Sequence, residues 1–308
     1  MNVNCTAKVD GFYEVGVRRN AASGNADIEW TGEHKNLLLD GFFTRWLGGS
    51  IANSNWRFFV GTGTTAAAAG QTVLDSQVGP ASNSATVTEN NTVLEASDYI
   101  ASSTGIAQWA IGAIVANISE VGANLRNVST GLDLDSRALI VDDVGETRTM
   151  PVTAGDQLVV RYTLRYRIPI AQHVSVVDFG GVSTTCTLET LNALGSAWHL
   201  RLGALSAGVP HQFGSITVSS SATLANNVTS TTPAGSFASV TYSYSSNGIA
   251  RVNTISASSS QLNAVVPIKY IQLNTVGGIS QGILFDPPIA KDNTKTLTLN
   301  FDYTLARA

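Results

Sequence analysis

Charged residues are scarce in this chain. Asp, Glu, Lys and Arg make up 13% of its 308 residues, about half of the roughly 25% found in ordinary soluble domains. Ser, Thr, Asn, Ala and Gly take their place. This exchange is common where surfaces meet other subunits, because charges are costly to bury. The formal net charge is −4, which gives no bulk basic face, so we expect no direct binding of nucleic acid.

Cysteine and histidine are also rare. Cys5 and Cys186 lie far apart in the sequence, and we expect both to be free thiols rather than part of a disulfide framework. The four histidines have no metal-ligand spacing, and no Cys-x-x-Cys motif occurs, so a metal site would need ligands from distant segments. We therefore expect no metal and no cofactor.

Long apolar runs are missing too. No stretch of about 18 apolar residues occurs, so we expect neither a membrane span nor a membrane partner. The opening MNVNCTAKVDGFYEV has no apolar centre of the signal-peptide kind, and we expect no such peptide. Apolar residues still make up 44% of the chain, close to the globular norm, so the chain is expected to fold around a core.

Alternation with a period of two fills much of the chain and predicts strands. Gly11–Arg19 places Tyr13, Val15 and Val17 on one face, and a turn joins it to a partner strand at 26–30, which predicts a hairpin. Further strands are predicted at Trp56–Val60 and Ala85–Glu95.

Two more predicted strands differ in character. Gln108–Ile118 is apolar on both faces and is expected between two layers. The longest alternating segment, Gln157–Ile168, gathers apolar side chains on one face and Arg161, Arg165 and Arg167 on the other.

Helical spacing is limited to two short segments. Asn36–Gly49 repeats apolar residues at helical intervals, with Asn36 as a possible cap and two glycines as a stop. A second short helix is expected near Leu188–Ala197. The prediction is a mainly β chain with one or two short helices.

The layout of Ser136–Ile168 returns at the end of the chain, in Ser280–Arg307. Each segment contains a strand that begins at serine, a loop with proline and a long amphipathic strand. Either one β module occurs twice, or short strands resemble each other by chance. Composition becomes richer in Ser and Thr from about residue 171. We therefore predict two β-sandwich-like modules, at residues 1–170 and 171–308.

No group of residues identifies a reaction, and we expect no enzyme. GTGTT at Gly61–Thr65 lacks the Lys-Ser/Thr ending of a phosphate loop, which favours a turn. An acidic cluster lacks the glycine and glutamate of a calcium loop, which favours a solvated strand edge. Its members are Asp133, Asp135, Asp142 and Asp143. A glycan-cleaving enzyme would need a carboxylate pair that sequence cannot place.

Two segments are candidate protein interfaces, and one set of aromatics is a candidate glycan contact. The first interface is the row formed by Arg161, Arg165 and Arg167; its alternative is a solvated strand face. The second is the Gly61–Gly70 loop, which alternatively is simply flexible; its candidate contacts are Gly61, Thr62, Gly63 and Thr64. The aromatic residues that could stack on sugars are Trp198, Tyr242 and Tyr244.

A succession of segments over the first 170 residues resembles virion structural proteins of tailed bacteriophages, of the tail, collar or fibre-attachment type. The matching segments, in order, are GFYEVGVRR, NLLLDGFFTRWLGG, RFFVGTGTTAAAAGQTVL, NISEVGANL, SRALIVDD and AGDQLVVRYTLRYR. They cover a little over half of the chain.

The resemblance implies a structural role in the virion, symmetric homo-oligomeric assembly and synthesis in the host cytoplasm. It supplies no catalytic residues. The function expected is a subunit of the tail, neck/collar or baseplate that joins or decorates other virion proteins. The alternatives are a capsid decoration (cement) protein and a tail module that binds host surface glycans.

Overall fold

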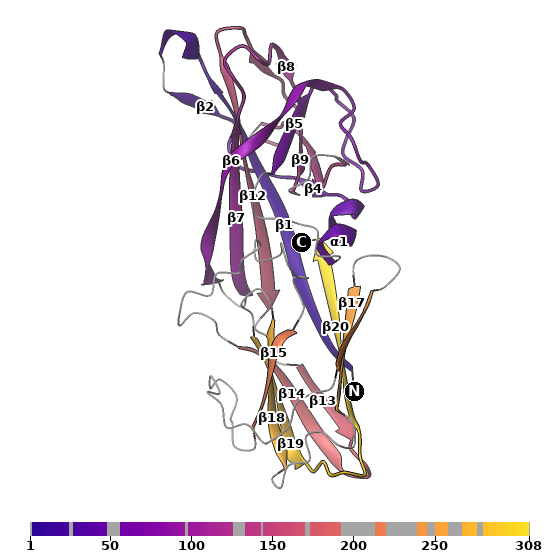
Figure 1. Ribbon diagram of the computed structural model, residues 1–308. Coiled ribbons are helices and arrows are strands. Elements are labelled where there is room, and N and C mark those ends of the chain that lie inside the picture. The colour runs from indigo at the N-terminus through magenta and orange to yellow at the C-terminus, as the bar shows by residue number, and fades with distance from the viewer. Residues whose placement is uncertain are drawn as a thin grey trace.

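The computed structural model describes a mainly β chain, which confirms the predicted fold class. The residues described are 2–24, 27–47, 56–95, 98–125, 133–142, 144–169, 173–191, 213–219, 239–244, 250–257, 267–275 and 280–307. The molecule is elongated, with β8 (Ala116–Ile118) towards one end and β13 (His173–Asp178) towards the other (Figure 1).

Thirteen strands form the largest sheet. Its main path runs in the order β16, β17, β20, β1, β12, β7, β6, β5, β9, β10, β4, and β2 and β3 also pair with β1. In that order the bounds are Ser239–Tyr244, Ala250–Ala257, Leu297–Arg307, Asn2–Arg18, Gln157–Pro169, Asp98–Gln108, Gln77–Glu95, Arg57–Gly61, Glu120–Asn124, Ser136–Leu139 and Leu37–Leu38, with β2 at Ile28–Trp30 and β3 at His34–Lys35.

Two smaller sheets complete the described strands. A five-stranded sheet has the order β13, β14 (Ser183–Leu191), β19 (Ser280–Ile289), β18 (Ile268–Thr275), β15 (Phe213–Ser219). A two-stranded sheet pairs β11 (Met150–Val152) with β8. The described helices are α1 (Asp40–Leu47) and the short 3-10 turn η1 (Ala21–Ser23).

Strand β1 lies between the two long strands that close the similar segments of the sequence. On one side β12 runs antiparallel to it, from Lys8 opposite Arg167 to Arg18 opposite Gln157. On the other side β20 runs parallel to the first half of β1. The strands that precede them also form comparable pairs, because β9 pairs with β10 and β18 with β19, both antiparallel.

This arrangement unites strands from both sides of residue 170 in one sheet. The division into modules at 1–170 and 171–308 stays a prediction, as does their duplication. β12 runs antiparallel to β1 and β20 runs parallel to it, so the two similar segments take different places in that sheet.

The apolar core lies against one face of β1 and β12, as the alternation predicts. Val15, Tyr162 and Leu164 are at most 2% exposed. The ring of Trp56 packs edge-on against Tyr162, with centroids 5.8 Å apart. From the far end of the chain, Leu305 of β20 joins the same core. The hairpin expected at the start of the chain is also present, since β2 pairs with β1.

Three local predictions need correction. The helix begins at Asp40 instead of Asn36, because Leu37–Leu38 pair with β10 and the Asn36 side-chain Nδ2 donates a hydrogen bond to the Tyr162 hydroxyl at 3.1 Å. The second helix is wrong over Leu188–Leu191, which belong to β14; the remainder of that prediction lies outside the described residues.

The third correction concerns Gln108–Ile118, which is not one strand. Strand β7 ends at Gln108 and the chain turns before β8. Gly112 takes a φ of +71°, and its amide donates to the carbonyl of Asp156 at 3.0 Å. Most of this apolar run, from Trp109 to Val115, is therefore a loop between β7 and β8.

Replacement of Leu305 tests whether β20 completes the core around β1. Leu305→Ala removes a side chain that is 1% exposed, and a loss of about 2–5 kcal/mol of unfolding free energy is expected. Urea denaturation measures it. Val176→Ala is the control, since Val176 is 68% exposed and should cost no more than about 0.5 kcal/mol. Equal effects of the two substitutions would contradict the packing of β20.

Candidate interaction surfaces

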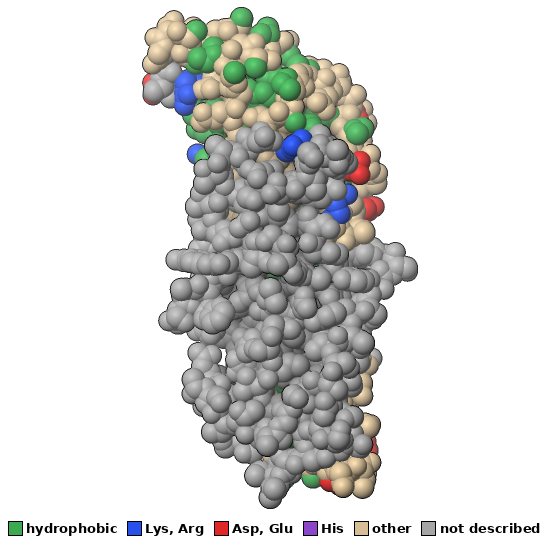
Figure 2. All heavy atoms as spheres, in the orientation of Figure 1, with side chains coloured by type: hydrophobic (Ala, Val, Ile, Leu, Met, Phe, Trp, Pro, Cys, Tyr) green, Lys and Arg blue, Asp and Glu red, His purple; other side chains and the backbone are tan. Residues whose placement is uncertain are grey.

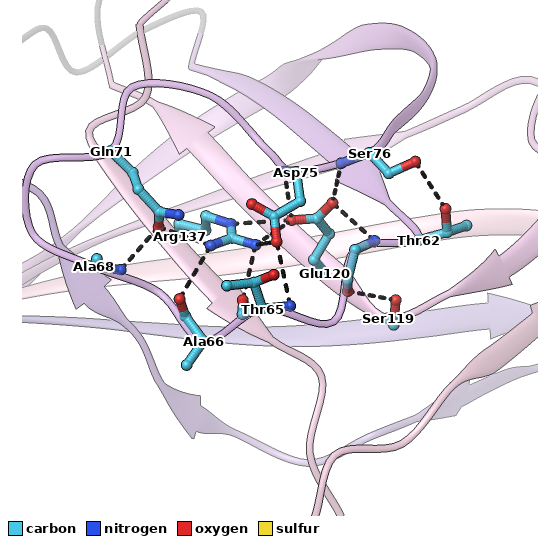
Figure 3. Close-up of polar contacts among 11 residues, drawn as sticks. Thr62, Thr65, Ala66, Ala68, Gln71, Asp75, Ser76, Ser119, Glu120 and Arg137 are labelled. Carbon is cyan, nitrogen blue, oxygen red and sulfur yellow. Dashed lines mark hydrogen bonds and ion pairs between the residues drawn. The ribbon is translucent and has the colours of Figure 1, made fainter.

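A buried ion pair lies beneath the glycine-rich loop that follows β5. Arg137 of β10 and Glu120 of β9 both have side chains with 0% exposure. The Arg137 guanidinium donates to Glu120 Oε2 from Nε at 3.0 Å and from Nη2 at 2.7 Å. These two strands are neighbours in the sheet, so the pair is fixed by the register. Figure 3 shows the loop folded over it.

Arg137 also binds the loop directly. Its Nη2 donates to the Thr65 carbonyl at 3.0 Å, and its Nη1 donates to Gln71 Oε1 at 2.7 Å. Asp75 adds a second carboxylate, with Oδ2 at 2.8 Å from Nη2. The buried cation therefore has polar partners on both sides, which offsets much of the cost of its desolvation.

Glu120 binds the two ends of the same loop. Its Oε1 accepts from the backbone amides of Gly63 at 3.0 Å and Ser76 at 2.8 Å. Gly61 and Gly63 have to be glycine here, because a β-carbon at either position would overlap Glu120 Oε1. GTGTT thus consists of the end of β5 and the start of a loop that folds around a carboxylate.

The candidate interface loop is accordingly held by the fold. Gly61 and Gly63 are buried, whereas Thr64 is exposed and Thr62 is half-buried. The Thr62 hydroxyl is occupied by a 3.1 Å hydrogen bond with Ser76 Oγ. A role of this loop in binding another protein stays a prediction, with Thr64 as its accessible member.

The arginine row lies on the face of β12 opposite the core, and each member has an acidic partner. Arg161 pairs with Glu14 at 2.6 Å, and Arg165 with Glu33 at 2.7 Å. Arg167 pairs with Asp10 at 3.3 Å.

Two members of the row also cover aromatic rings. Arg161 lies 4.6 Å above the ring of Trp30, and Arg165 lies 4.1 Å above Phe12. The three side chains are between 29% and 37% exposed. Their charges are thus matched within the chain, and a role in an interface stays a prediction.

The aspartates of the acidic cluster that the structure describes do not share one site; two of them form separate local hydrogen bonds. Asp135 is buried, accepts from Arg45 Nε at 2.6 Å and accepts from the Leu125 amide at 2.6 Å. Asp142 accepts from the amides of a turn. Asp133 is exposed, and Asp143 lies outside the described residues. Within the described part of the chain no three His, Cys, Asp or Glu side chains are placed to hold a metal ion.

The aromatic residues proposed for glycan contact are only partly placed. Trp198 lies outside the described residues. Tyr242 and Tyr244 belong to β16, the last strand on one side of the large sheet's path. Their side chains are not described, so a contact with sugars stays a prediction. No helix in the described ranges is long and apolar enough to cross a membrane.

Asp156 is a polar centre that sequence reasoning missed. It is 4% exposed, and its Oδ2 accepts from the Thr153 amide at 2.9 Å and from Arg19 Nη1 at 3.1 Å. Its Oδ1 accepts from the Asn20 amide at 3.0 Å. Burial opposes ionisation, but the hydrogen bonds from Thr153, Asn20 and Arg19 outweigh it and lower the pKa of Asp156 to about 2.

Asp156 helps to hold an apolar loop that points outwards. Its carbonyl binds Gly112 of the segment that joins β7 to β8. Trp109 anchors the start of that segment, donating from Nε1 to the Pro80 carbonyl at 2.9 Å. Ile111 and Val115 nevertheless remain 46% and 58% exposed. The loop therefore presents apolar side chains from a well-anchored backbone.

Among the residues that the structure describes, the exposed large apolar side chains fall into two groups. The β8 group lies in connections of the part of the molecule that contains β5, β8 and β9, where Figure 2 shows apolar side chains gathered at one end. Its members are Val73, Ile111, Val115 and Val144. The β13 group lies in or directly after β13, towards the other end (Figure 1). Its members are Val174, Val176 and Val182.

Comparisons of the chain with protein-family models, with curated proteins and with solved structures find no match.

Removal of the buried cation should destabilise the fold strongly. Arg137→Met leaves the Glu120 carboxyl group buried without its cationic partner, and a loss of about 3–5 kcal/mol is expected in denaturant unfolding. The double variant Arg137→Met/Glu120→Gln should lose less, because the fully buried carboxylate is then neutral and only the partly exposed Asp75 lacks its cation. The exposed Lys8→Met is the control and should cost no more than about 0.5 kcal/mol. A double variant less stable than Arg137→Met would contradict this interpretation.

Asp156 should make stability depend on pH in the acid range. Its pKa falls from an ordinary 3.8 to about 2 on folding, so the ionised carboxyl stabilises the fold above about pH 4. That contribution disappears as the pH falls through about 2. The stability difference between wild type and Asp156→Asn, on the order of 1–2 kcal/mol at pH 6, should therefore shrink towards pH 2. Denaturant unfolding across this range measures it, and a constant difference would contradict the assignment.

Proposed function

We propose that this chain is a non-enzymatic structural subunit of a bacteriophage virion, placed at the tail, neck/collar or baseplate. In this role it assembles symmetrically with copies of itself and joins or decorates other virion proteins. The observation that carries the proposal is the presence of exposed apolar groups near both ends of an elongated chain.

Single exposed apolar residues are normal on any protein, but gathered ones commonly mark contacts with other proteins. In the β8 group, Ile111 and Val115 share one short loop. In the β13 group, Val174 and Val176 are two positions apart on one strand and point to the same face. Two such groups far apart suit a subunit that contacts a different neighbour at each end.

Anchoring of the apolar loop supports a docking role. Side chains on a fixed backbone lose less conformational freedom on binding than side chains on a mobile one, so less of the interaction energy is spent on ordering. The hydrogen bonds of Trp109 and Gly112 supply this anchoring.

The distribution of charge supports protein partners. Charged residues are depleted at the centre of protein interfaces, and this chain contains only 13% of them. The conspicuous arginine row is matched by its own acids. The order of motifs that resembles tailed-phage virion proteins supplies the choice of assembly.

Substitution at each end tests the proposal. The phage gene for this chain is deleted, and the chain is supplied from a plasmid during infection. Ile111→Asp and Val176→Asp should each lower the number of copies of the chain per particle at least about tenfold, because each puts a charge into an apolar contact. Quantitative mass spectrometry of purified particles measures the copy number. Asn293→Asp, which adds the same charge at another exposed position, should incorporate normally.

The outcomes separate the candidate roles. Absence of the wild-type chain from particles would overturn the virion proposal. Its release together with the capsid shell, after tails are separated, would favour the capsid decoration alternative. Normal incorporation of both charged variants would overturn the assignment of these end groups as contacts.

A further inference from the structure

A small cavity of about 220 Å³ lies where the turn between β13 and β14 meets the connection from β19 to β20. None of the described residues named above as candidate contacts lines it. Its apolar walls are Phe179, Ile289 and Leu297. Its polar lining includes Lys291, Lys295 and Thr296.

The apolar walls are fixed by packing. Ile289 and Leu297 are 6% and 3% exposed. The ring of Phe179 meets Phe285 edge to face, with centroids 6.0 Å apart and an angle of 86°. The turn that carries Phe179 is closed by hydrogen bonds from its amide to the Val182 carbonyl at 2.9 Å and from the Gly181 amide to Asp178 Oδ1 at 2.8 Å. The cavity is thus preformed.

Two lysines line this small space. Lys291 is only 5% exposed, and its Nζ donates to the Asp292 carbonyl at 3.4 Å. Lys295 lies in the same connection, and its side chain is 50% exposed. Burial disfavours the charged form of Lys291 and lowers its pKa, an effect that the nearby Asp292 opposes.

The carboxylate of the neighbouring Asp292 is largely taken up by its own turn. Asp292 Oδ1 accepts from the Thr294 amide at 2.9 Å and from the Thr294 hydroxyl at 2.6 Å. Asp292 Oδ2 lies 3.5 Å from Lys295 Nζ. None of the eight residues that line the cavity is acidic, and two of them are lysines. With one adjacent carboxylate, Asp292, already paired with Lys295, the site keeps a positive balance that favours an anion.

We propose that this cavity binds the carboxylate of a single acidic sugar residue. The two lysines would bind the carboxylate through charge-assisted hydrogen bonds. The volume is below the roughly 300 Å³ at which sites for larger ligands begin, which suits one ring. Phe179 and the aliphatic walls would pack against the carbon face of that ring.

The open side of the cavity suits the rest of a sugar. Gly180, Ala290 and Thr296 are exposed, so one side of a bound ring would remain in water, where hydroxyl groups are favoured. The Thr296 hydroxyl would offer one further hydrogen bond. This proposal is independent of the virion assignment, because it concerns binding by the isolated chain.

Isothermal titration calorimetry with sodium D-glucuronate as the probe tests the proposal on the purified full chain. D-glucose and inorganic phosphate are the comparison ligands. Lys295→Ala changes an exposed side chain and should leave the fold intact, while Lys291→Met keeps the length of the buried side chain. Lys269→Ala, on β18 of the same sheet, is the matched control.

The expected result is binding of glucuronate at least about tenfold tighter than of glucose or phosphate. Lys295→Ala and Lys291→Met should each weaken it about tenfold or more, and Lys269→Ala should not. Absence of binding, equal binding of glucose, or equal affinity of all three variants would overturn the proposal. Binding of phosphate as tight as that of glucuronate would overturn the sugar assignment.

Discussion

The pairing of β1 with strands from two distant parts of the chain is the constraint on which the rest of the described structure depends. β12 lies about 150 positions away in sequence and β20 almost 300, yet both flank the same strand. Since loop closure costs entropy that only the completed contacts repay, this topology requires a strong apolar face on every partner. The side chains of Val15, Leu164 and Leu305 supply that face.

Some of this fold is readable in the sequence because the signal is local. The alternation in Gln157–Ile168 predicts both the strand and its buried face, and the structure confirms them. The partners of β1 are not readable in the same way, because any amphipathic strand could pair with any other. Gln108–Ile118 misleads for a related reason: apolar composition looks the same in a buried strand and in a loop that exposes Ile111 and Val115.

The polar sites show the same division between local and distant information. A charged residue within an apolar strand occurs twice, as Glu120 and as Arg137, and this was a usable sign of a buried ion pair. Their joint contact with the loop after β5, Glu120 at Gly63 and Arg137 at Thr65, was not predictable, since three separate segments meet there. The cavity beside Lys291 depends likewise on a turn more than 100 residues earlier in the chain.

The proposed function depends on exposed apolar side chains near both ends of the molecule. Cryo-electron microscopy of intact phage particles that contain the chain tests it most directly, since it shows what each end touches. The account predicts symmetric copies in the tail, neck or baseplate, with Ile111 and Val115 buried against one neighbour and Val174 and Val176 buried against another. Density in which both ends face solvent would contradict it.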